Sequence, residues 1–242
     1  MNVANLCEVH CIKISLSYLH SQFFYLKKRN VFLIIFLIVI ADQVLKIYVK
    51  THYHPGESHP VLGHWFRLYF IENEGMAYGW KLGGGLGKIT LTLFRLAAVI
   101  FGVFYLNRII KRKYHRGYII CVALVFAGAL GNLIDSMFYG LIFDNNSFDT
   151  SAVATLFPKK GYAGFLHGNV VDMLYLPLVH VDQLPRWIPF FGGKPFSFFN
   201  YIFNIADASV SIGVIIIPFF RKRFFHLEDK TLSENQAISI IE

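Results

Sequence analysis

Four long apolar runs lie along the chain, separated by more polar segments. A helix needs about 20 mostly apolar residues to span the hydrocarbon core of a bilayer. Four segments are about this long, namely Val31–Val49, Lys88–Ile109, Gly117–Phe138 and Tyr201–Phe220. The pattern therefore predicts an all-α membrane fold, a bundle of four transmembrane helices.

Clusters of basic residues lie at the same end of these predicted helices. They precede the first run (27–29), fill the short link between the second and third runs (108–116) and follow the fourth (221–223). Basic residues beside membrane helices mark the cytoplasmic side. We therefore expect a multi-pass protein of the bacterial inner (cytoplasmic) membrane, with both termini in the cytoplasm.

With this orientation the two long connections, Lys50–Gly87 and Tyr139–Asn200, face outward. The first holds the stretch Val61–Ile71, whose β-forming residues predict a short sheet or hairpin at the bilayer surface. The second holds five prolines among many aromatic residues, which is typical of an interfacial loop. The expected fold is thus a four-helix membrane bundle with a small outward-facing β element and an outer loop insert.

The chain divides into three parts. Residues 1–30 form an N-terminal extension, either disordered or the product of a start codon assigned too early, and we assign it no function. No small-residue cleavage site follows the next apolar run, which argues against a removed signal peptide. Residues 31–220 form the four-helix membrane domain, and residues 221–242 form a cytoplasmic tail.

Composition agrees with a membrane protein and explains the net charge. Hydrophobic residues make up 55% of the 242 residues and charged residues 16%, which is less charge than a soluble domain carries. The net charge of +8 does not indicate nucleic acid, because the basic residues lie in short blocks beside the apolar runs. Cys7, Cys11 and Cys121 have neither metal-ligand spacing nor that of a disulfide framework.

Charged residues lie deep within all four predicted helices. At 1.5 Å of rise per residue, Asp42 lies roughly 17 Å from the cytoplasmic boundary, Arg95 roughly 18 Å, Asp207 roughly 21 Å and Asp135 roughly 27 Å. Lys46 follows Asp42 by four residues and shares its helix face. Ionisable residues inside a membrane are costly and are functional by default. We expect one functional cluster in the outer half of the bilayer; a set of structural ion pairs is the alternative.

Four short motifs add amides and carboxylates to this cluster. In the third run, Asn132 and Asp135 lie on one helix face, and glycines nearby let helix backbones approach closely. In chain order the motifs are Asn73-Glu74-Gly75-Met76-Ala77, Gly128-Ala129-Leu130-Gly131-Asn132-Leu133-Ile134-Asp135, Val170-Val171-Asp172 and Phe203-Asn204-Ile205-Ala206-Asp207.

In their joint order these motifs resemble the lipoprotein signal peptidase family, also called signal peptidase II. That family has four spans, an aspartate–lysine pair in the first, and Asn-x-Gly-x-Ala, Gly-x-x-Gly-Asn-x-x-Asp, Val-Val-Asp and Phe-Asn-x-Ala-Asp motifs. All of them occur here, in order, across Val31–Phe220. The resemblance implies an aspartic endopeptidase that removes signal peptides from prolipoproteins, cutting before a cysteine that carries a diacylglyceryl group. It would act as a monomer at the periplasmic side of the inner membrane.

The resemblance also assigns roles to residues. Asp172 and Asp207 match the catalytic pair of the family. Other positions expected to bind substrate or support the site are Asp42, Lys46, Asn73, Gly131, Asn132, Asp135, Asn204 and Ala206. The expected partners are the prolipoprotein substrate and membrane lipid, without nucleic acid, and neither a cofactor nor a metal is expected.

Two features depart from the family pattern. Many members have Arg directly after the aspartate of the third helix, where this chain has Ser136. We expect Arg95 to supply that charge by pairing with Asp42 or Asp135; the alternative is an arginine that points to lipid and reaches the headgroups. The segment Leu174–Tyr201 is also longer than expected for the family, and it would cover the site or dock a partner.

Two aspartates suit peptide hydrolysis without a metal. Close carboxylates cannot both ionise, so they share a proton, and one acts as base toward water while the other acts as acid toward the carbonyl. A proton relay or transporter also uses buried charges, and it predicts flux without cleavage. A non-catalytic scaffold predicts that conservative changes at the two aspartates are harmless. The Gly-x-Gly-Asp signature of presenilin-like proteases is absent.

Histidines in the first outer segment are a further candidate site. His52, His54, His59 and His64 have the chemistry to bind a metal. They lack a helical i, i+4 pair and lie in a loop, so we predict that they bind none. Glu74 is interpreted as a surface residue and not as a third catalytic acid.

Overall fold

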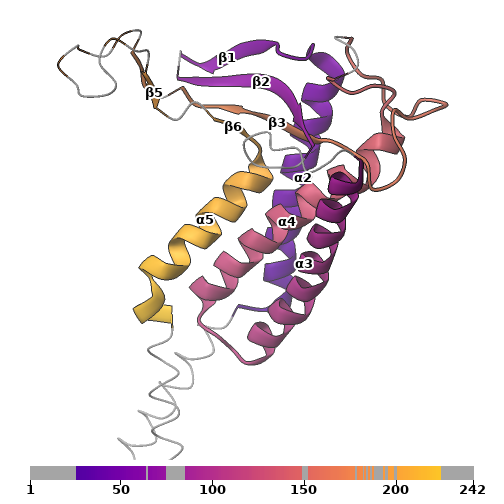
Figure 1. The fold of residues 1–242 in the computed structure, drawn as a ribbon. Helices are drawn as coiled ribbons and strands as arrows, with labels where there is room; N and C mark the ends of the chain where they lie inside the picture. Colours follow the sequence, from indigo (N-terminus) through magenta and orange to yellow (C-terminus); the bar gives the residue numbers. More distant parts are fainter. Residues whose placement is uncertain are drawn as a thin grey trace, which may run out of the picture.

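Four helices stand side by side, and the strands lie across one end of them in the computed structural model (Figure 1). The structure describes residues 26–63, 65–74, 85–148, 152–177 and 201–224, together with positions 179–181, 183, 185, 187, 193 and 196–198. The helices are α2 (Lys28–His52), α3 (Gly85–Lys111), α4 (Arg116–Ile142) and α5 (Ile205–Phe219). The central helix α4 packs against the other three.

Three of the four helices are long enough to cross a membrane. α2, α3 and α4 qualify by length and apolar composition, whereas α5 is a shorter apolar helix of 15 residues. The long helices expose large apolar side chains such as Phe32, Phe94 and Phe104. Apolar side chains on the outside of a bundle are expected where the surroundings are lipid. α2 begins at Lys28, so the expected boundary of the extension at residue 30 falls inside the helix, and residues 1–25 lie outside the described residues.

The fourth predicted span, Tyr201–Phe220, was too long at its start. Ile202 and Phe203 form strand β6 (Ile202–Phe203), and the helix begins only at Ile205. Asn204 is the N-cap, and its side chain accepts a hydrogen bond from the backbone N–H of Asp207 at 2.8 Å. Asparagine at this position satisfies an N–H that the helix itself cannot. Hydropathy joined the strand to the helix because both are apolar.

The predicted hairpin around Val61–Ile71 is present and belongs to a larger sheet. β1 (Ser58–Leu62) pairs antiparallel with β2 (Phe66–Asn73), which pairs with β3 (Val170–Tyr175), which pairs with β6. The sheet order is β1-β2-β3-β6. The second long connection is therefore not only a loop, because Val170–Tyr175 is a strand that joins the first long connection to the strand before α5.

The insert expected at Leu174–Tyr201 is shorter than predicted. Leu174 and Tyr175 pair with Phe203 and Ile202 and so belong to the sheet. Within the insert, the described residues include a two-stranded pair of β4 (Val179–Val181) and β5 (Phe196–Phe198). Most of the rest lies outside the described residues.

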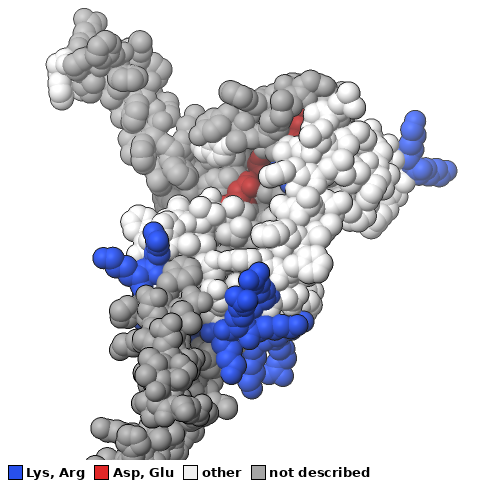
Figure 2. All heavy atoms as spheres, turned by 60° about the horizontal axis from the view of Figure 1, so that its bottom comes forward, with Lys and Arg blue, Asp and Glu red and all other residues white. Residues whose placement is uncertain are grey.

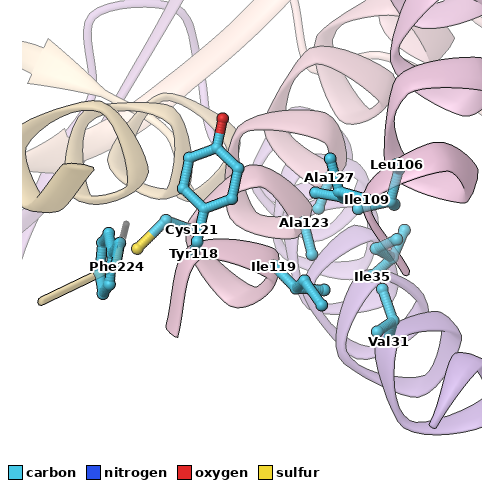
Figure 3. Packing of buried hydrophobic residues seen from close by; sticks show 10 residues of the cluster. All are labelled: Val31, Ile35, Leu106, Ile109, Tyr118, Ile119, Cys121, Ala123, Ala127 and Phe224. Carbon is cyan, nitrogen blue, oxygen red and sulfur yellow. The ribbon is translucent and has the colours of Figure 1, made fainter. Parts of the chain in front are cut away.

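Two apolar clusters hold the bundle together at different levels. One lies at the end away from the sheet and joins α2, α3, α4 and the residues after α5; Figure 3 shows ten of its side chains, including Val31, Ile109 and Phe224. The other lies beneath the sheet and includes Val49, Tyr139 and Met173. The buried charged groups lie between these clusters or at the edge of the second.

Candidate active site

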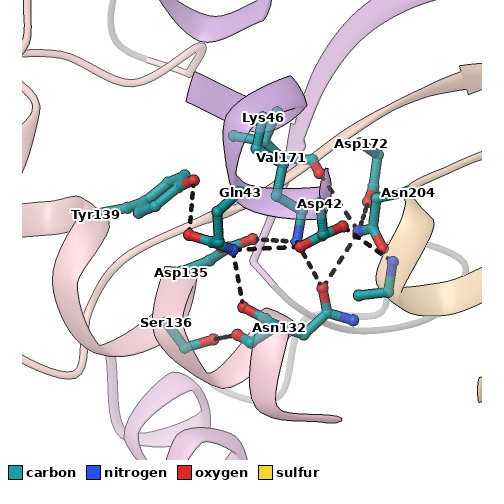
Figure 4. A network of polar contacts seen from close by, with 12 residues as sticks. Asp42, Gln43, Lys46, Asn132, Asp135, Ser136, Tyr139, Val171, Asp172 and Asn204 are labelled. Atoms are coloured by element: carbon teal, nitrogen blue, oxygen red, sulfur yellow. Dashed lines mark hydrogen bonds and ion pairs between the residues drawn. The ribbon is translucent and has the colours of Figure 1, made fainter. Parts of the chain in front are cut away.

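Polar side chains from α2, α4, α5 and the sheet meet where the sheet covers the bundle (Figure 4). The centre of this network is Lys46, whose side chain is fully buried. Its ammonium lies 2.8 Å from Asp42 Oδ2 and 2.6 Å from Asp135 Oδ2, and it donates to Asn132 Oδ1 at 2.9 Å. The ammonium thus has two ion-pair partners and one hydrogen-bond acceptor.

Asp42 connects this cluster to α5. Its Oδ1 accepts the backbone N–H of Ala206 at 2.9 Å, in the first turn of α5. The first N–H groups of a helix have no partner within the helix and attract negative charge. Gly131 makes this approach possible, since a Cβ there would lie 2.9 Å from Asp42 Oδ2 and 3.2 Å from Ala206 Cβ. The expected small residues Gly131 and Ala206 thus leave room for Asp42 between α4 and α5.

The two predicted catalytic aspartates are linked through two asparagines. Asn132 Nδ2 donates to Asp207 Oδ1 at 2.7 Å, and Asn204 Nδ2 donates to Asp172 Oδ1 at 2.6 Å. Asn204 Nδ2 also lies 3.2 Å from Asn132 Oδ1, which connects the two amides. Amide groups hold each carboxylate in place without adding charge.

A third amide, from the sheet, approaches the pair of Asp172 and Asp207, which we call the dyad. Asn73 Nδ2 donates to Asp172 Oδ2 at 3.0 Å, so both oxygens of Asp172 accept a hydrogen bond. β2 and β3 place these residues together, because Asn73 pairs with Val170 and Ile71 with Asp172. Gly75, Met76 and Ala77, the rest of that predicted motif, lie outside the described residues.

The environment of Asp172 favours its protonated form. Burial and, to a smaller extent, the nearby charge of Asp207 raise the pKa of Asp172 to about 7, although the hydrogen bond from Asn73 acts in the opposite direction. Asp172 is buried, whereas Asp207 is half-buried in the first turn of α5. A carboxylate is favourable at a helix N-terminus. The two carboxyl groups thus occupy different environments, one dry and one at a helix end.

The predicted pairing of Arg95 with Asp42 or Asp135 needs correction. The ion pairs of both carboxylates are made with Lys46. Arg95 Nη1 instead donates to the hydroxyl of Ser136 at 2.8 Å. The pairing failed as a prediction because depth along a helix does not say which neighbour lies across from a side chain.

Sequence reasoning missed Gln43, which fixes the orientation of the carboxylates of Asp42 and Asp135. Its Nε2 donates to Asp135 Oδ1 at 2.8 Å and lies 3.2 Å from Asp42 Oδ2, and its Oε1 accepts from Tyr139 OH at 3.2 Å. An uncharged amide beside Asp42 gave no signal of its own. Its position next to a buried aspartate in an apolar run was the available clue.

A second buried polar cluster lies at the end of α2 near the sheet. Lys50 forms an ion pair with Glu72 and lies over the rings of Phe143 and Tyr162. Glu72 Oε2 also accepts from Asn169 Nδ2 at 3.0 Å. Glu72 directly precedes Asn73 in β2, so this cluster fixes the strand that brings Asn73 to the dyad. Lys50 was interpreted only as the start of a connection, because lysines at helix ends are common.

Neither cluster has the ligand pattern of a metal site. Among the described residues, no group of three or more His, Cys, Asp or Glu side chains is arranged to hold a metal ion. His59 contacts Glu57 at 2.6 Å, and His52 contacts the carbonyl oxygen of Tyr48 at 2.9 Å. His64 lies outside the described residues.

Comparison with known proteins gives one consistent result. The family model described as signal peptidase (SPase) II matches residues 34–221. A lipoprotein signal peptidase of Porphyromonas gingivalis is 43% identical over 186 residues, which cover 76% of this chain and 79% of that protein. One of Amoebophilus asiaticus is 33% identical over 184 residues, 75% of this chain and 72% of that protein. A solved structure described as a bacterial membrane enzyme at 1.9 Å resolution has a TM-score of 0.51 and 26% identity, and covers 81% of this chain and 94% of that one.

Proposed function

The chain belongs to the signal peptidase II family, and from this premise we propose that it is an aspartic endopeptidase that removes signal peptides from prolipoproteins. The matched region includes every charged and amide side chain of the network around Lys46. The observation that carries the aspartic mechanism is the amide-linked pair of Asp172 and Asp207, brought together from a strand and a helix.

The different environments of the two aspartates suggest different roles, one as general acid and one as general base. Asp172, buried and with a raised pKa of about 7, holds the shared proton and donates it to the carbonyl oxygen of the scissile peptide. Asp207, at the N-terminus of α5, is the base that takes a proton from the attacking water. Water oxygen bonds to the carbonyl carbon and gives a neutral gem-diol. When the C–N bond breaks, Asp207 returns a proton to the leaving nitrogen and Asp172 takes one from a diol hydroxyl, which restores the dyad.

The distribution of basic residues along the bundle supports a location for the site at the periplasmic side of the membrane. Exposed Lys and Arg side chains occur at 27–29, 111–113 and 221–223, at the end of the helices away from the sheet. Figure 2 shows most of the visible basic side chains toward that end, others at the opposite edge of the molecule, and acidic ones between them. Because basic residues favour the cytoplasmic side, this supports both termini in the cytoplasm of an inner membrane and the dyad at the periplasmic side.

This location suits a substrate with a lipid anchor. The dyad lies where the apolar helices α4 and α5 meet the sheet, so a cysteine-linked diacylglyceryl group could stay among lipid chains while its peptide reaches Asp172 and Asp207. The substrate is therefore a prolipoprotein with a diacylglyceryl-cysteine, presented from the bilayer to a monomeric enzyme without cofactor.

Cleavage of matched substrates tests this function. The purified protein in lipid vesicles is incubated with one prolipoprotein, either carrying the diacylglyceryl group or lacking it, and the product is measured by gel shift. We expect cleavage of the lipidated form before its cysteine and a rate at least about tenfold lower for the other, the loss of roughly 1.4 kcal/mol of binding. A chelator should leave the rate unchanged. Equal rates for the two substrates would contradict lipid recognition, and absence of cleavage would contradict the function.

A further inference from the structure

Arg95 lies on the face of α3 that packs against the protein. Thr92 and Val99, three residues before and four after, are buried on the same face, whereas Phe94 is 69% exposed. The hydroxyl of Thr92 donates to the carbonyl oxygen of Leu166 at 3.2 Å. This face therefore turns toward α4 and the segment before β3, and Arg95 turns with it.

Ser136 is the residue that meets the guanidinium. Its hydroxyl accepts from Arg95 Nη1 at 2.8 Å and donates to the backbone carbonyl of Asn132 at 2.9 Å. Ser136 is buried, and its short side chain leaves the space above this turn of α4 to Arg95. The same turn carries Asn132, whose amide holds Asp207. Arg95 is thus connected to Asp207 indirectly, through the hydroxyl of Ser136 and the turn of α4 that carries Asn132.

The charges around Arg95 are carboxylates. Those that act on it most are Asp135, then the two members of the dyad, Asp207 and Asp172. Lys46 is already shared between Asp42 and Asp135. With one proton on the dyad, the four carboxyl groups carry three negative charges against two positive ones. Without Arg95 the buried site has a net charge of −2, and uncompensated buried charge is strongly unfavourable.

We propose that Arg95 is the counter-ion of the aspartate dyad, a positioning residue delivered from α3 into the space that the small side chain of Ser136 leaves open. This inference rests on the proposed aspartic mechanism. Arg95 lowers the proton affinity of the dyad and so sets the pH range in which the dyad carries a single proton. In the described part of the chain, Lys46 on α2 also acts on Asp172, and it is paired with Asp42 on the same helix and with Asp135 on α4.

The sign of the pH effect follows from this charge. Removing a positive group makes the carboxyl groups hold protons more tightly, so both limbs of the pH–rate profile move to higher pH. The wild-type alkaline limb is expected near pH 7, where Asp172 loses its proton. For Arg95→Gln we expect an upward shift on the order of one pH unit, and hence about a tenfold loss of kcat/KM on the acid side. Arg95→Lys keeps the charge and should keep the wild-type profile.

The experiment is the pH–rate profile of cleavage by the full chain in vesicles. Arg108→Gln, at the exposed end of the same helix, is the matched control and should leave the profile unchanged. Exchanging the residues at positions 95 and 136 tests directly whether Arg95 occupies the space beside Ser136. Arg95→Ser should shift the profile, Ser136→Arg should lower the rate because two guanidinium groups compete for one space, and the combination should return the profile toward wild type.

Each outcome decides the inference. An unshifted Arg95→Gln profile, even with a reduced rate, would show a purely structural role and overturn it, as would a double variant no better than Arg95→Ser. The swapped pair also serves if Arg95→Gln does not fold, since it retains a guanidinium at the same place. Cleavage that survives Asp207→Asn would instead contradict the proposed function, whereas a normal need for Asp207 with an unshifted Arg95→Gln profile contradicts this inference alone.

Discussion

Lys46 is the single residue on which most of the polar network depends. Its two ion-pair partners and one hydrogen-bond partner come from two helices, and one of them, Asn132, holds the carboxylate of Asp207. A buried lysine is costly unless it is paired, and two carboxylates without their cation cost more. The ion pair thus supports the position of Asn132 as well as the packing of α2 against α4.

Replacement of Lys46 by Met should therefore destabilise the protein by roughly 3–5 kcal/mol, the cost of removing one partner from a buried ion pair. Thermal unfolding in detergent measures the effect, with Lys159→Met as a matched control at an exposed lysine. Adding Asp135→Asn to Lys46→Met should recover part of the loss, because it removes one of the unpaired charges. An unfolding temperature equal to wild type in Lys46→Met would contradict this account of the cluster.

At the scale of elements, the sheet joins parts of the chain that lie far apart in the sequence. β3 lies between β2 and β6, so one strand connects the segment between α2 and α3 to the start of α5. Val171 and Met173 pack into the core below the sheet, and Asp172, between them in the sequence, accepts a hydrogen bond from Asn204, the N-cap of α5. The pairing of Leu174 with Phe203 and of Tyr175 with Ile202 sets where α5 begins.

The insert can be removed without touching that pairing. Deletion of residues 179–198 removes β4 and β5 but keeps Tyr175 and Ile202, which leaves a connection of six residues, within the usual range for linked strands. We expect the shortened protein to insert into the membrane and unfold at nearly the wild-type temperature, with turnover altered several-fold. Leu174→Pro is the control, because proline in a strand paired on both sides breaks ladder hydrogen bonds and should lower stability. Loss of membrane insertion on deletion would show that the insert is part of the fold.

At the scale of the whole molecule, hydropathy predicted the three long helices, and the basic clusters predicted which ends lie together. Hydropathy placed the start of the fourth helix wrongly, at Tyr201–Asn204, because strand pairing with β3 is a long-range interaction that an apolar run does not reveal. The hairpin at Val61–Ile71 was predicted from local β-forming residues, whereas its third strand was not.

Site residues that lie in sequence motifs were predicted, whereas those that only the fold brings together were missed. Asp172, Asp207, Asn132 and Asn204 lie in motifs, and the structure brings them together. Gln43 and Lys50 carried no motif, and the contact between Arg95 and Ser136 depends on how α3 is rotated against α4. Rotation of a helix about its axis cannot be read from the depth of a residue along it.

The most direct test of the central claim is single-turnover cleavage of a lipidated prolipoprotein by Asp172→Asn and Asp207→Asn, beside Asp144→Asn. Asp144 is an exposed carboxylate that accepts a hydrogen bond from the backbone N–H of Thr155 at 2.8 Å and lies outside the network around Lys46, so the change is chemically matched. If the two aspartates share the catalytic proton, each dyad variant should lose at least about a thousandfold in rate, roughly 4 kcal/mol of transition-state stabilisation, while remaining folded. Asp144→Asn should cleave at the wild-type rate. Near-wild-type cleavage by either folded dyad variant would contradict the account.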